Sequence, residues 1–270
     1  MIVFCTSGCK KDMDPFVWVK SIPHPWILSE VEFESYLPKF QERFPNYHDR
    51  LKAINLWRVG TPYGLFCLGE ESGRDTDPLI RVDSSDCTVH VLTTLAFAES
   101  FTWQNSRDAI IDIHYKMDGN GEKKPTYNSR WHYTSDRLLH HERTVDITSS
   151  VASKNDLETV EIELNKKLDG SEFLNLDWSS KELIQFIPSV KISTEHLEKL
   201  PAVCGIAFVK KSYFKMGIVI AHEGYLIDQS NLIHASSEYG KTVNVDLMNY
   251  LMNDGIPRFD GIMFYKINSK

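Results

Sequence analysis

Three residues of this chain have the types and the spacing of a nucleophile, its base and a group that orients the base. Cys87 follows Asp86, His222 lies far downstream, and His234 comes twelve residues after His222. A thiol attacks as its thiolate, and an imidazole can take the proton. A polar partner on the far nitrogen of that imidazole holds its tautomer. The set therefore indicates covalent catalysis by Cys87, with His222 as the general base and His234 as the orienting group.

Other residues of the same types carry weaker signals. A cysteine in an apolar helix is more often an inert core residue. His90, one helical turn after Cys87, is either a competing partner for the thiol or a packed ring. The run 140–142 has two histidines and a glutamate but lacks the H-E-x-x-H spacing of a zinc site. We therefore expect neither a metal nor a cofactor.

A helix must place the thiol. The residues from 88 to 101 include no glycine or proline, and the four before Cys87 (residues 83–86) are aspartates and serines, which favour N-cap positions. Cys87 should therefore lie in the first turn of a buried helix. Backbone N–H groups at a helix start favour thiolate over thiol and can stabilise an oxyanion.

A hairpin must place the two histidines. Residues 216–227 and the run from Leu232 read as strands joined by a short loop. Opposed residues of an antiparallel pair have a constant sum of positions and share one face. His222 opposes His234 if Leu226 opposes Ser230, which leaves a three-residue loop. A four-residue loop would put the two rings on opposite faces, so the constellation requires an odd loop length.

The remaining pattern predicts an α+β protein. Residues 29–57 have helical spacing, and 60–86 read as an ordered loop. The segment 109–115 is β-like, while 181–190 and 193–200 read as short helices or turns. Later strands are expected at residues 203–209, 217–227, 232–236, 241–245 and 261–267. Helices first and an antiparallel sheet last is an α+β order.

Composition excludes several classes of function. The net charge is −7 and no Lys/Arg run is present, which argues against nucleic-acid binding. No apolar stretch approaches the roughly 20 residues of a membrane span. The five cysteines are odd in number and lack C-x-x-C pairs, so neither a disulfide framework nor a zinc ribbon is expected. The pattern does not indicate an oligomeric state.

The first residues read like the tail of a bacterial lipoprotein signal. Small residues precede Cys9 and a polar stretch follows it, although the basic region and most of the apolar region of such a signal are missing. On this reading residues 1–9 are a signal remnant, and the protein works in the cell envelope or periplasm with Cys9 as a lipid anchor. Otherwise it is cytoplasmic. Residues 10–270 then form a single catalytic domain, with 10–59 as a helical lead-in and 102–200 as an insertion.

Four blocks of the chain resemble a known family. They are Gly60-Thr61-Pro62-Tyr63, the run from Arg81 to Thr88, Ser129-Arg130-Trp131-His132-Tyr133, and Ala221-His222-Glu223-Gly224 with Ile233-His234-Ala235-Ser236. The likeness is to the AmiA-like family of N-acetylmuramoyl-L-alanine amidases, within the NlpC-type papain-like cysteine peptidases. It implies a papain-like fold, with the nucleophile at the N-terminus of a buried helix packed on an antiparallel sheet. The insertion lies between nucleophile and sheet.

The resemblance also implies roles for single residues. Cys87, His222 and His234 would be catalytic, while Tyr63 and Asp86 would lie beside the nucleophile and shape the binding of a peptidoglycan or muropeptide substrate. The signature that contains Arg130 and His132 adds two further candidates for substrate binding.

Two arginines are candidates for binding a substrate carboxylate. A guanidinium matches a carboxylate in a bidentate fork, so Arg130, and with it Arg81, could clamp the alanine end of the substrate. The alternative for Arg130 is a structural ion pair.

The chain departs from the family pattern in two places. His90 and Leu92 occupy positions where the family usually has an aromatic and an acidic residue, and a G-D turn expected before the sheet appears as Cys204-Gly205. These departures bear on substrate fit and loop geometry more than on the chemistry. Two alternatives to the amidase also stay open. One is an endopeptidase that cuts between L-alanine and D-glutamate, and the other is an inactive cell-wall-binding module.

Overall fold

The computed structural model describes residues 15–270, so the predicted signal remnant at residues 1–9 lies outside the described part. The α-helices are α1 (Pro15–Ser21), α2 (Glu30–Glu34), α3 (Leu37–Arg43), α4 (Tyr47–Trp57), α5 (Cys87–Glu99), α6 (Trp103–His114), α7 (Thr134–His140), α8 (Thr148–Val151), α9 (Thr194–Glu198) and α10 (Leu247–Leu251). Short 3₁₀ helices are η1 (Pro25–Ile27), η2 (Tyr127–Ser129), η3 (Ser189–Lys191) and η4 (Lys211–Met216). None of the helices in this part of the chain has the length and apolar character needed to cross a membrane.

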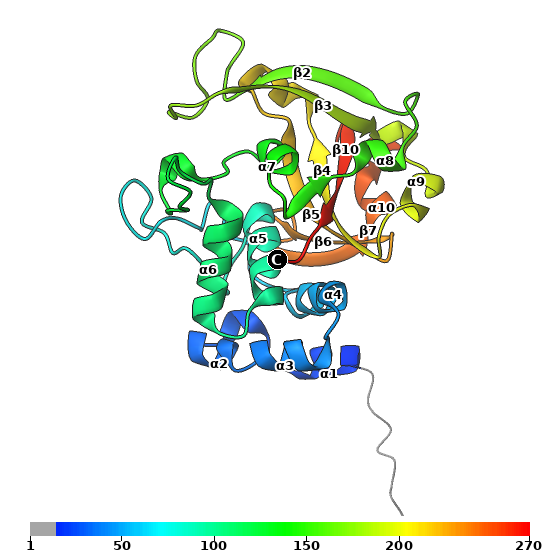
Figure 1. Cartoon of the computed structure of the whole chain (residues 1–270). Coiled ribbons are helices and arrows are strands. Elements are labelled where there is room, and N and C mark those ends of the chain that lie inside the picture. Colours follow the sequence, from blue (N-terminus) through cyan, green and yellow to red (C-terminus); the bar gives the residue numbers. More distant parts are fainter. Residues whose placement is uncertain (1–14) are drawn as a thin grey trace, which may run out of the picture.

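The strands form an antiparallel sheet. They are β1 (Thr144–Asp146), β2 (Glu158–Leu164), β3 (Ser180–Pro188), β4 (Val203–Val209), β5 (Ile220–Ile227), β6 (Asn231–Ser236), β7 (Lys241–Asp246) and β10 (Gly261–Ile267). The order across the sheet is β2-β3-β10-β4-β5-β6-β7, with β1 paired to β10. The pair β8 (Met252–Asn253) and β9 (Ile256–Pro257) is separate. Figure 1 shows the helical N-terminal part and the later sheet, which confirms the predicted α+β class.

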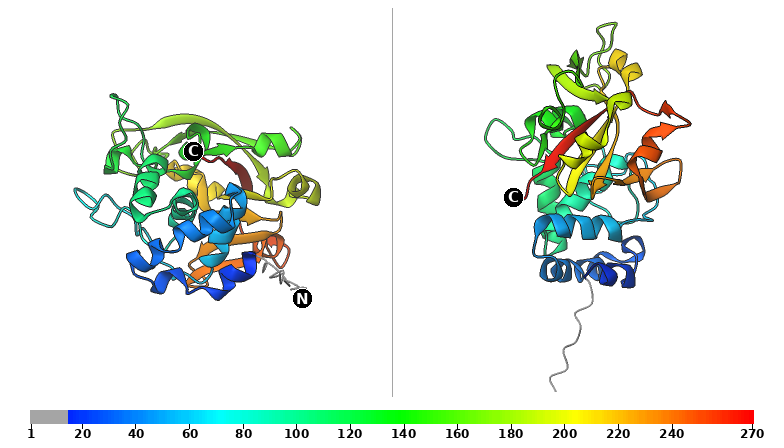
Figure 2. Two further views of the ribbon diagram at one scale, coloured as in Figure 1. Left: turned by 60° about the horizontal axis from the view of Figure 1, so that its bottom comes forward. Right: turned by 90° about the vertical axis from the view of Figure 1, so that its right-hand side faces the viewer.

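Helix α5 lies at the centre of the helical layer. It contacts α4 and α6 on one side and strands β5 and β6 on the other, and both views in Figure 2 show α1–α4 gathered on the same side of the molecule. Residues 89–98 of α5 are all buried. A helix that is apolar all round belongs in a core, and each buried leucine, such as Leu95, contributes about 1.5–3 kcal/mol. This packing holds the start of α5 rigidly against the sheet.

The other face of the sheet has its own apolar layer. Phe208, Leu226 and Phe264 pack there against Leu247 and Leu251 of α10. The alternation of buried side chains along each strand sends neighbouring residues to opposite layers. Tyr225 and Ile227 therefore join the α5 side, while Leu226 joins the α10 side.

Two segments differ from the sequence-based expectation. Residues 109–115 were expected to be β-like, yet most of them belong to α6, whose buried residues Ala109, Ile110, Ile113 and His114 have helical spacing. Residues 181–190 were expected to form a short helix or turn, yet 180–188 form β3. There Leu183 is exposed and Ile184 buried, and the strand pairs with both β2 and β10. In both cases long-range packing overrides weak local preference.

The histidine hairpin has the required odd loop. Ile227 pairs with Asn231, which leaves a loop of three residues, Asp228 to Ser230. The register is shifted by two from the one predicted, because Leu226 pairs with Leu232 rather than with Ser230. An even shift keeps both rings on one face. His222 and His234 are therefore diagonal neighbours, and Gly224 rather than His222 lies opposite His234.

Candidate active site

Cys87 is the first residue of α5, as the sequence predicted. The side chain of Asp86 caps the helix, because its Oδ1 accepts the N–H of Val89 at 2.9 Å. Its Oδ2 accepts the N–H of Phe66 at 2.9 Å, so both oxygens of this buried carboxylate are occupied. Asp86 thus holds Phe66 of the preceding loop to the start of α5, and its role in substrate binding stays a prediction.

The protonation state of Cys87 differs from the expectation at a helix start. Burial, followed by the nearby carboxylates of Asp86 and Glu223, raises the pKa of the Cys87 thiol to about 12. The backbone N–H of Glu223 and the hydroxyl of Thr88 act in the opposite direction by hydrogen bonding. The predicted preference for thiolate is therefore wrong for the resting site, because the cost of burying the charge exceeds the gain from the helix N-terminus. At neutral pH the thiol keeps its proton, so Cys87 would need a base to act as the predicted nucleophile.

His222 and His234 form a direct pair. Nε2 of His222 lies 2.7 Å from Nδ1 of His234, and the rings stand at 83° to each other. Burial lowers the pKa of His222 to about 4 and is the main cause that lowers the pKa of His234 to about 3. Both rings are therefore neutral at pH 7, so one donates to the other. When His222 donates through Nε2, its Nδ1 keeps a lone pair that can accept a proton.

Strand β5, which carries His222, contacts the start of α5 beside Cys87, where the hydroxyl of Thr88 donates to Glu223 at 2.9 Å. The backbone N–H of Glu223, the residue after His222, also lowers the pKa of the Cys87 thiol. Among the described residues, no hydrogen bond joins Cys87 directly to His222. Catalytic contacts are often loose before substrate binds and tighten in the complex.

Aromatic rings and a small pocket surround His222. Phe208 and Phe259 stack near its ring, and Tyr250 lies 4.5 Å from the ring of His234. The pocket has a volume of about 230 Å³ and is lined by polar, aromatic and small side chains, namely Lys210, Tyr213, Ala221, His222, Ser236, Ser237, Glu238, Tyr250 and Phe259. A larger hollow of about 520 Å³ lies between η1 and β7 and is lined by none of the predicted site residues.

Tyr63 lies near the thiol, on the loop before α5. Its backbone N–H donates to Gly240 at 3.0 Å, and residue 63 forms a bridge with Ser85. Burial, and then the proximity of Cys87, raises the pKa of its phenol, while a hydrogen bond with Ser237 lowers it. The structure thus brings Tyr63 to Cys87 and to the pocket residue Ser237.

Sequence reasoning missed two exposed apolar residues beside this site. Leu65 and Phe66 are 60% and 78% exposed, and Phe66 has a φ of 51°, which is rare for a bulky residue. Because Asp86 holds the N–H of Phe66, this conformation is fixed next to Cys87. The signal in the sequence was the pair of apolar residues inside a loop.

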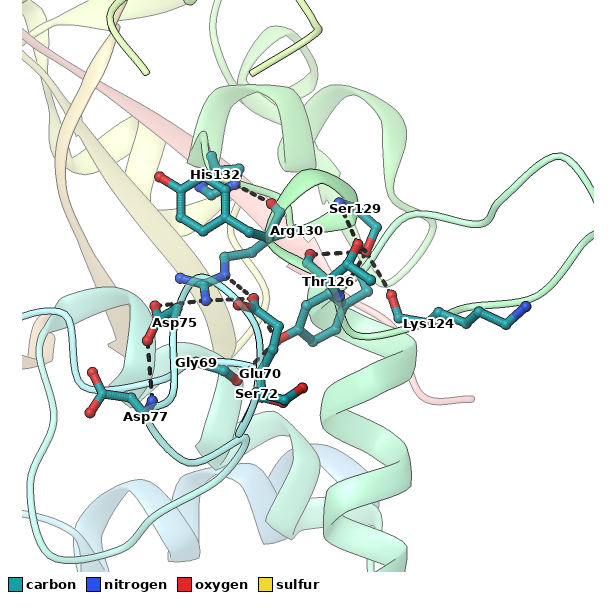
Figure 3. Close-up of polar contacts among 12 residues, drawn as sticks. Gly69, Glu70, Ser72, Asp75, Asp77, Lys124, Thr126, Ser129, Arg130 and His132 are labelled. Atoms are coloured by element: carbon teal, nitrogen blue, oxygen red, sulfur yellow. Dashed lines mark hydrogen bonds and ion pairs between the residues drawn. The ribbon is translucent and has the colours of Figure 1, made fainter. Parts of the chain in front are cut away.

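Arg130 and His132 lie in a separate polar cluster (Figure 3). Nε of Arg130 donates to Glu70 at 2.8 Å and its NH2 group contacts Asp75 at 2.9 Å. Nε2 of His132 lies 2.6 Å from the carbonyl oxygen of Tyr127, and burial lowers the pKa of His132 to about 4. Neither residue lines the pocket at His222. The contacts of Arg130 are those of the structural ion pair, and its role as a clamp stays a prediction.

Arg81 also has an ion-pair partner. Its Nε and NH2 groups donate to the two carboxylate oxygens of Asp83, each at 2.7 Å. This bidentate fork is the arrangement expected for a substrate carboxylate, but here a neighbouring side chain occupies it.

His90 packs inside the core. Its Nε2 lies 3.0 Å from Oδ1 of Asn55, its ring meets Tyr225 edge-on, and burial holds its pKa well below the usual value. Of the two alternatives for His90, the structure favours the packed ring.

One group in the described residues has the types and proximity of metal ligands. Ligand atoms of Asp136, His140 and Glu182 lie within 4.8 Å of one another. The ammonium of Lys116 lies 2.5 Å from Asp136 and already compensates that carboxylate. We assign no metal to this group.

The chain is similar to known proteins in sequence and in fold. A family model described as AmiA-like, N-acetylmuramoyl-L-alanine amidase-like, matches residues 54–256. No curated protein matches the chain. Among solved structures, LPG0564 from Legionella pneumophila str. Philadelphia 1, described as DUF1460, is 23% identical with a TM-score of 0.69, over 88% of this chain and 95% of that one.

Two structures from Bacteroides are also similar. An N-acetylmuramoyl-L-alanine amidase from Bacteroides uniformis ATCC 8492 is 20% identical with a TM-score of 0.60, over 83% of this chain and 99% of that one. A putative xylanase from Bacteroides fragilis is 21% identical with a TM-score of 0.60, over 80% and 99%. At these identities the structures show a shared fold. Because the family model spans most of the chain, the predicted resemblance is confirmed, and the protein belongs to the AmiA-like, N-acetylmuramoyl-L-alanine amidase-like family.

Proposed function

We propose that the protein is a cysteine amidase on an NlpC-type papain-like fold. Its reaction is hydrolysis of the amide between N-acetylmuramic acid and L-alanine in peptidoglycan fragments. The family supports a peptidoglycan amidase-like role. The observation that carries the proposal of cysteine catalysis is the 2.7 Å contact between His222 and His234. The residue after His222, Glu223, accepts a hydrogen bond at 2.9 Å from Thr88, the residue after Cys87.

The protonation states support a neutral resting site. The Cys87 thiol carries its proton and His222 is neutral, because burial opposes both charges. When the scissile carbonyl approaches, Nδ1 of His222 takes the thiol proton as sulfur attacks the carbonyl carbon. The charge that develops on the carbonyl oxygen is stabilised by backbone N–H groups at the start of α5, including that of Cys87.

The second half of the reaction releases the two products in turn. The tetrahedral intermediate collapses, the C–N bond breaks, and the proton on His222 passes to the nitrogen of alanine. A thioester to Cys87 remains. Water then gives a proton to His222 and attacks the thioester, and the carboxylic acid leaves as the thiol recovers its proton. Throughout, the bond to His234 holds the His222 ring in one orientation.

The pocket at His222 supports a small substrate group. Its volume of about 230 Å³ suits a single residue rather than a long chain, so we propose that it receives the part of a fragment next to the scissile bond. Tyr63 lies near the thiol and Ser237. The exposed side chain of Phe66 offers an apolar contact at the rim.

The test is product analysis on two substrates. Purified protein is incubated with N-acetylmuramoyl-L-alanine and, separately, with a free stem tripeptide. Release of alanine from the first alone supports the amidase. Cleavage of the tripeptide alone would identify an L-alanine–D-glutamate endopeptidase, and no product from either would identify a binding module.

A pair of cysteine variants tests the nucleophile. Cys87→Ala should abolish turnover, while Cys67→Ala, which removes another free thiol of the described chain, should keep it. Turnover that survives in Cys87→Ala would refute the mechanism.

A further inference from the structure

Glu223 is a charged residue in the middle of an apolar strand. It follows His222 in β5 and is 1% exposed. Because side chains alternate along a strand, it points away from the His222 face and toward the helical layer. A carboxylate is almost never buried so fully without compensating partners.

Four donors surround the Glu223 carboxylate. Oε1 accepts the hydroxyls of Thr88 at 2.9 Å and Thr134 at 3.0 Å. Oε2 accepts a guanidinium N–H of Arg137 at 2.6 Å and the hydroxyl of Tyr265 at 2.9 Å. Arg137 is as deeply buried as Glu223, so the two charges compensate each other.

These partners belong to different parts of the chain. Thr88 is the residue after Cys87 in α5, Thr134 and Arg137 lie on α7, and Tyr265 lies on β10. Gly205 on β4 gives Tyr265 its space, because a Cβ at that position would come within 1.9 Å of the phenol ring. The Cys204-Gly205 pair is thus part of a strand, where the glycine serves the partner of Glu223, rather than a turn before the sheet.

We propose that Glu223 is a positioning residue, which ties the start of the nucleophile helix through Thr88 to the strand that carries His222 and links both to α7. The role rests on the proposed function of Cys87 and His222. The Glu223 carboxylate holds Thr88, and the backbone of Glu223 continues directly into His222. A single buried network therefore sets the separation between the Cys87 thiol and the His222 imidazole. Pre-organisation of this kind removes the need to align the two groups during the reaction.

The charge of Glu223 also reaches the thiol. The titratable groups that act on Cys87 are Asp86, which caps its helix, Glu223 on β5, Tyr63 on the preceding loop and Tyr250 on α10. The Glu223 carboxylate opposes the thiolate, whereas the hydroxyl of Thr88 donates its one proton to that carboxylate and so weakens the opposition. Removing the charge of Glu223 should therefore raise the thiolate fraction of Cys87, and removing the hydroxyl of Thr88 should lower it.

The experiment measures alkylation of Cys87 by iodoacetamide at about pH 8, where the rate follows the thiolate fraction. Because the chain has five cysteines, mass spectrometry follows the peptide that contains Cys87. Glu223→Gln should raise the rate constant by about tenfold, which corresponds to one pKa unit. Thr88→Val should lower it by about threefold, and should lower kcat by about tenfold with little change in KM.

A matched control is Glu99→Gln. Glu99 ends the same helix, about 18 Å away by helical rise, and is paired with Arg143. It should leave the alkylation rate unchanged.

An equal alkylation rate in Glu223→Gln and the wild type would overturn the proposal. Rates that shift in the same direction in Glu223→Gln and Thr88→Val would also overturn it, because a general loosening of the site would produce that result. If Glu223→Gln does not fold, Thr88→Val decides alone, because it keeps the ion pair with Arg137. Alkylation of Cys87 needs no turnover, so it tests the role of Glu223 independently of the amidase proposal. The turnover assay with Cys87→Ala tests the amidase proposal.

Discussion

Replacing Gly224 with alanine should disturb the histidine pair directly. A Cβ at this position would lie 2.8 Å from the carbonyl oxygen of Ile233 and 2.9 Å from Cβ of His234. Both distances are shorter than real Cβ contacts, and the first neighbour is backbone, which cannot rotate away. Strand β6 must therefore shift by a few tenths of an ångström at least, and the 2.7 Å contact between His222 and His234 must lengthen.

The expected cost has two parts. Overpacking of this kind lowers the free energy of unfolding by about 1–3 kcal/mol, which for a chain of this size lowers Tm by about 2–10 °C. Misplacement of the orienting ring should reduce kcat by about tenfold to 10²-fold, because small errors in alignment are amplified in the barrier.

The assay combines thermal unfolding with alanine release. Gly119→Ala is the matched control, since no atom lies within 4 Å of a Cβ at residue 119. It should leave both Tm and kcat near the wild-type values. A Gly224→Ala variant with wild-type Tm and wild-type kcat would refute the reasoning that Gly224 permits the approach of His234.

Four further predictions address the site and its surroundings. His234→Ala should lower kcat by about 10²-fold to 10⁴-fold, because His222 loses the partner that holds its tautomer; kcat within about twofold of the wild type would contradict this. Because burial lowers the pKa of His222 to about 4 and raises that of Cys87 to about 12, kcat/KM should stay flat through neutral pH and fall only toward pH 4; a fall centred near the ordinary imidazole value would argue against a buried base. The same depressed histidine pKa values mean that the unfolded chain binds more protons, so urea unfolding should show lower stability at about pH 5 than at about pH 7. Arg130→Ala should lower stability by about 3–5 kcal/mol, because it leaves the buried Glu70 unpaired, with KM unchanged; a raised KM with unchanged Tm would favour the carboxylate clamp.

Local signals were sufficient for several elements. The start of α5 followed from the cap residue Asp86 and an uninterrupted apolar run, because capping is an interaction within four residues. The need for an odd hairpin loop followed from the two-residue period of a strand. The loop length was correct, but the register was off by two, since parity cannot distinguish 226–230 pairing from the 226–232 pairing that the structure has.

Other elements depended on contacts between distant residues. Residues 109–115 are rich in β-branched side chains, yet all but Tyr115 form the end of α6, which packs against α5. Residues 180–188 became β3 because β2 and β10 supply partners on both sides. The partners of Arg130 are 60 and 55 residues away, so its sequence neighbourhood could not distinguish a clamp from an ion pair.

The sequence by itself determined which residue types could do the chemistry and which local elements carry them. Cys87 follows a cap residue, and the two histidines lie at a spacing that permits one shared face. Only the tertiary structure decided their protonation, because burial depends on everything packed around them and opposes charge on both the thiol and the imidazoles. It also revealed Glu223, whose four donors come from three other elements and whose importance no single stretch of sequence contains.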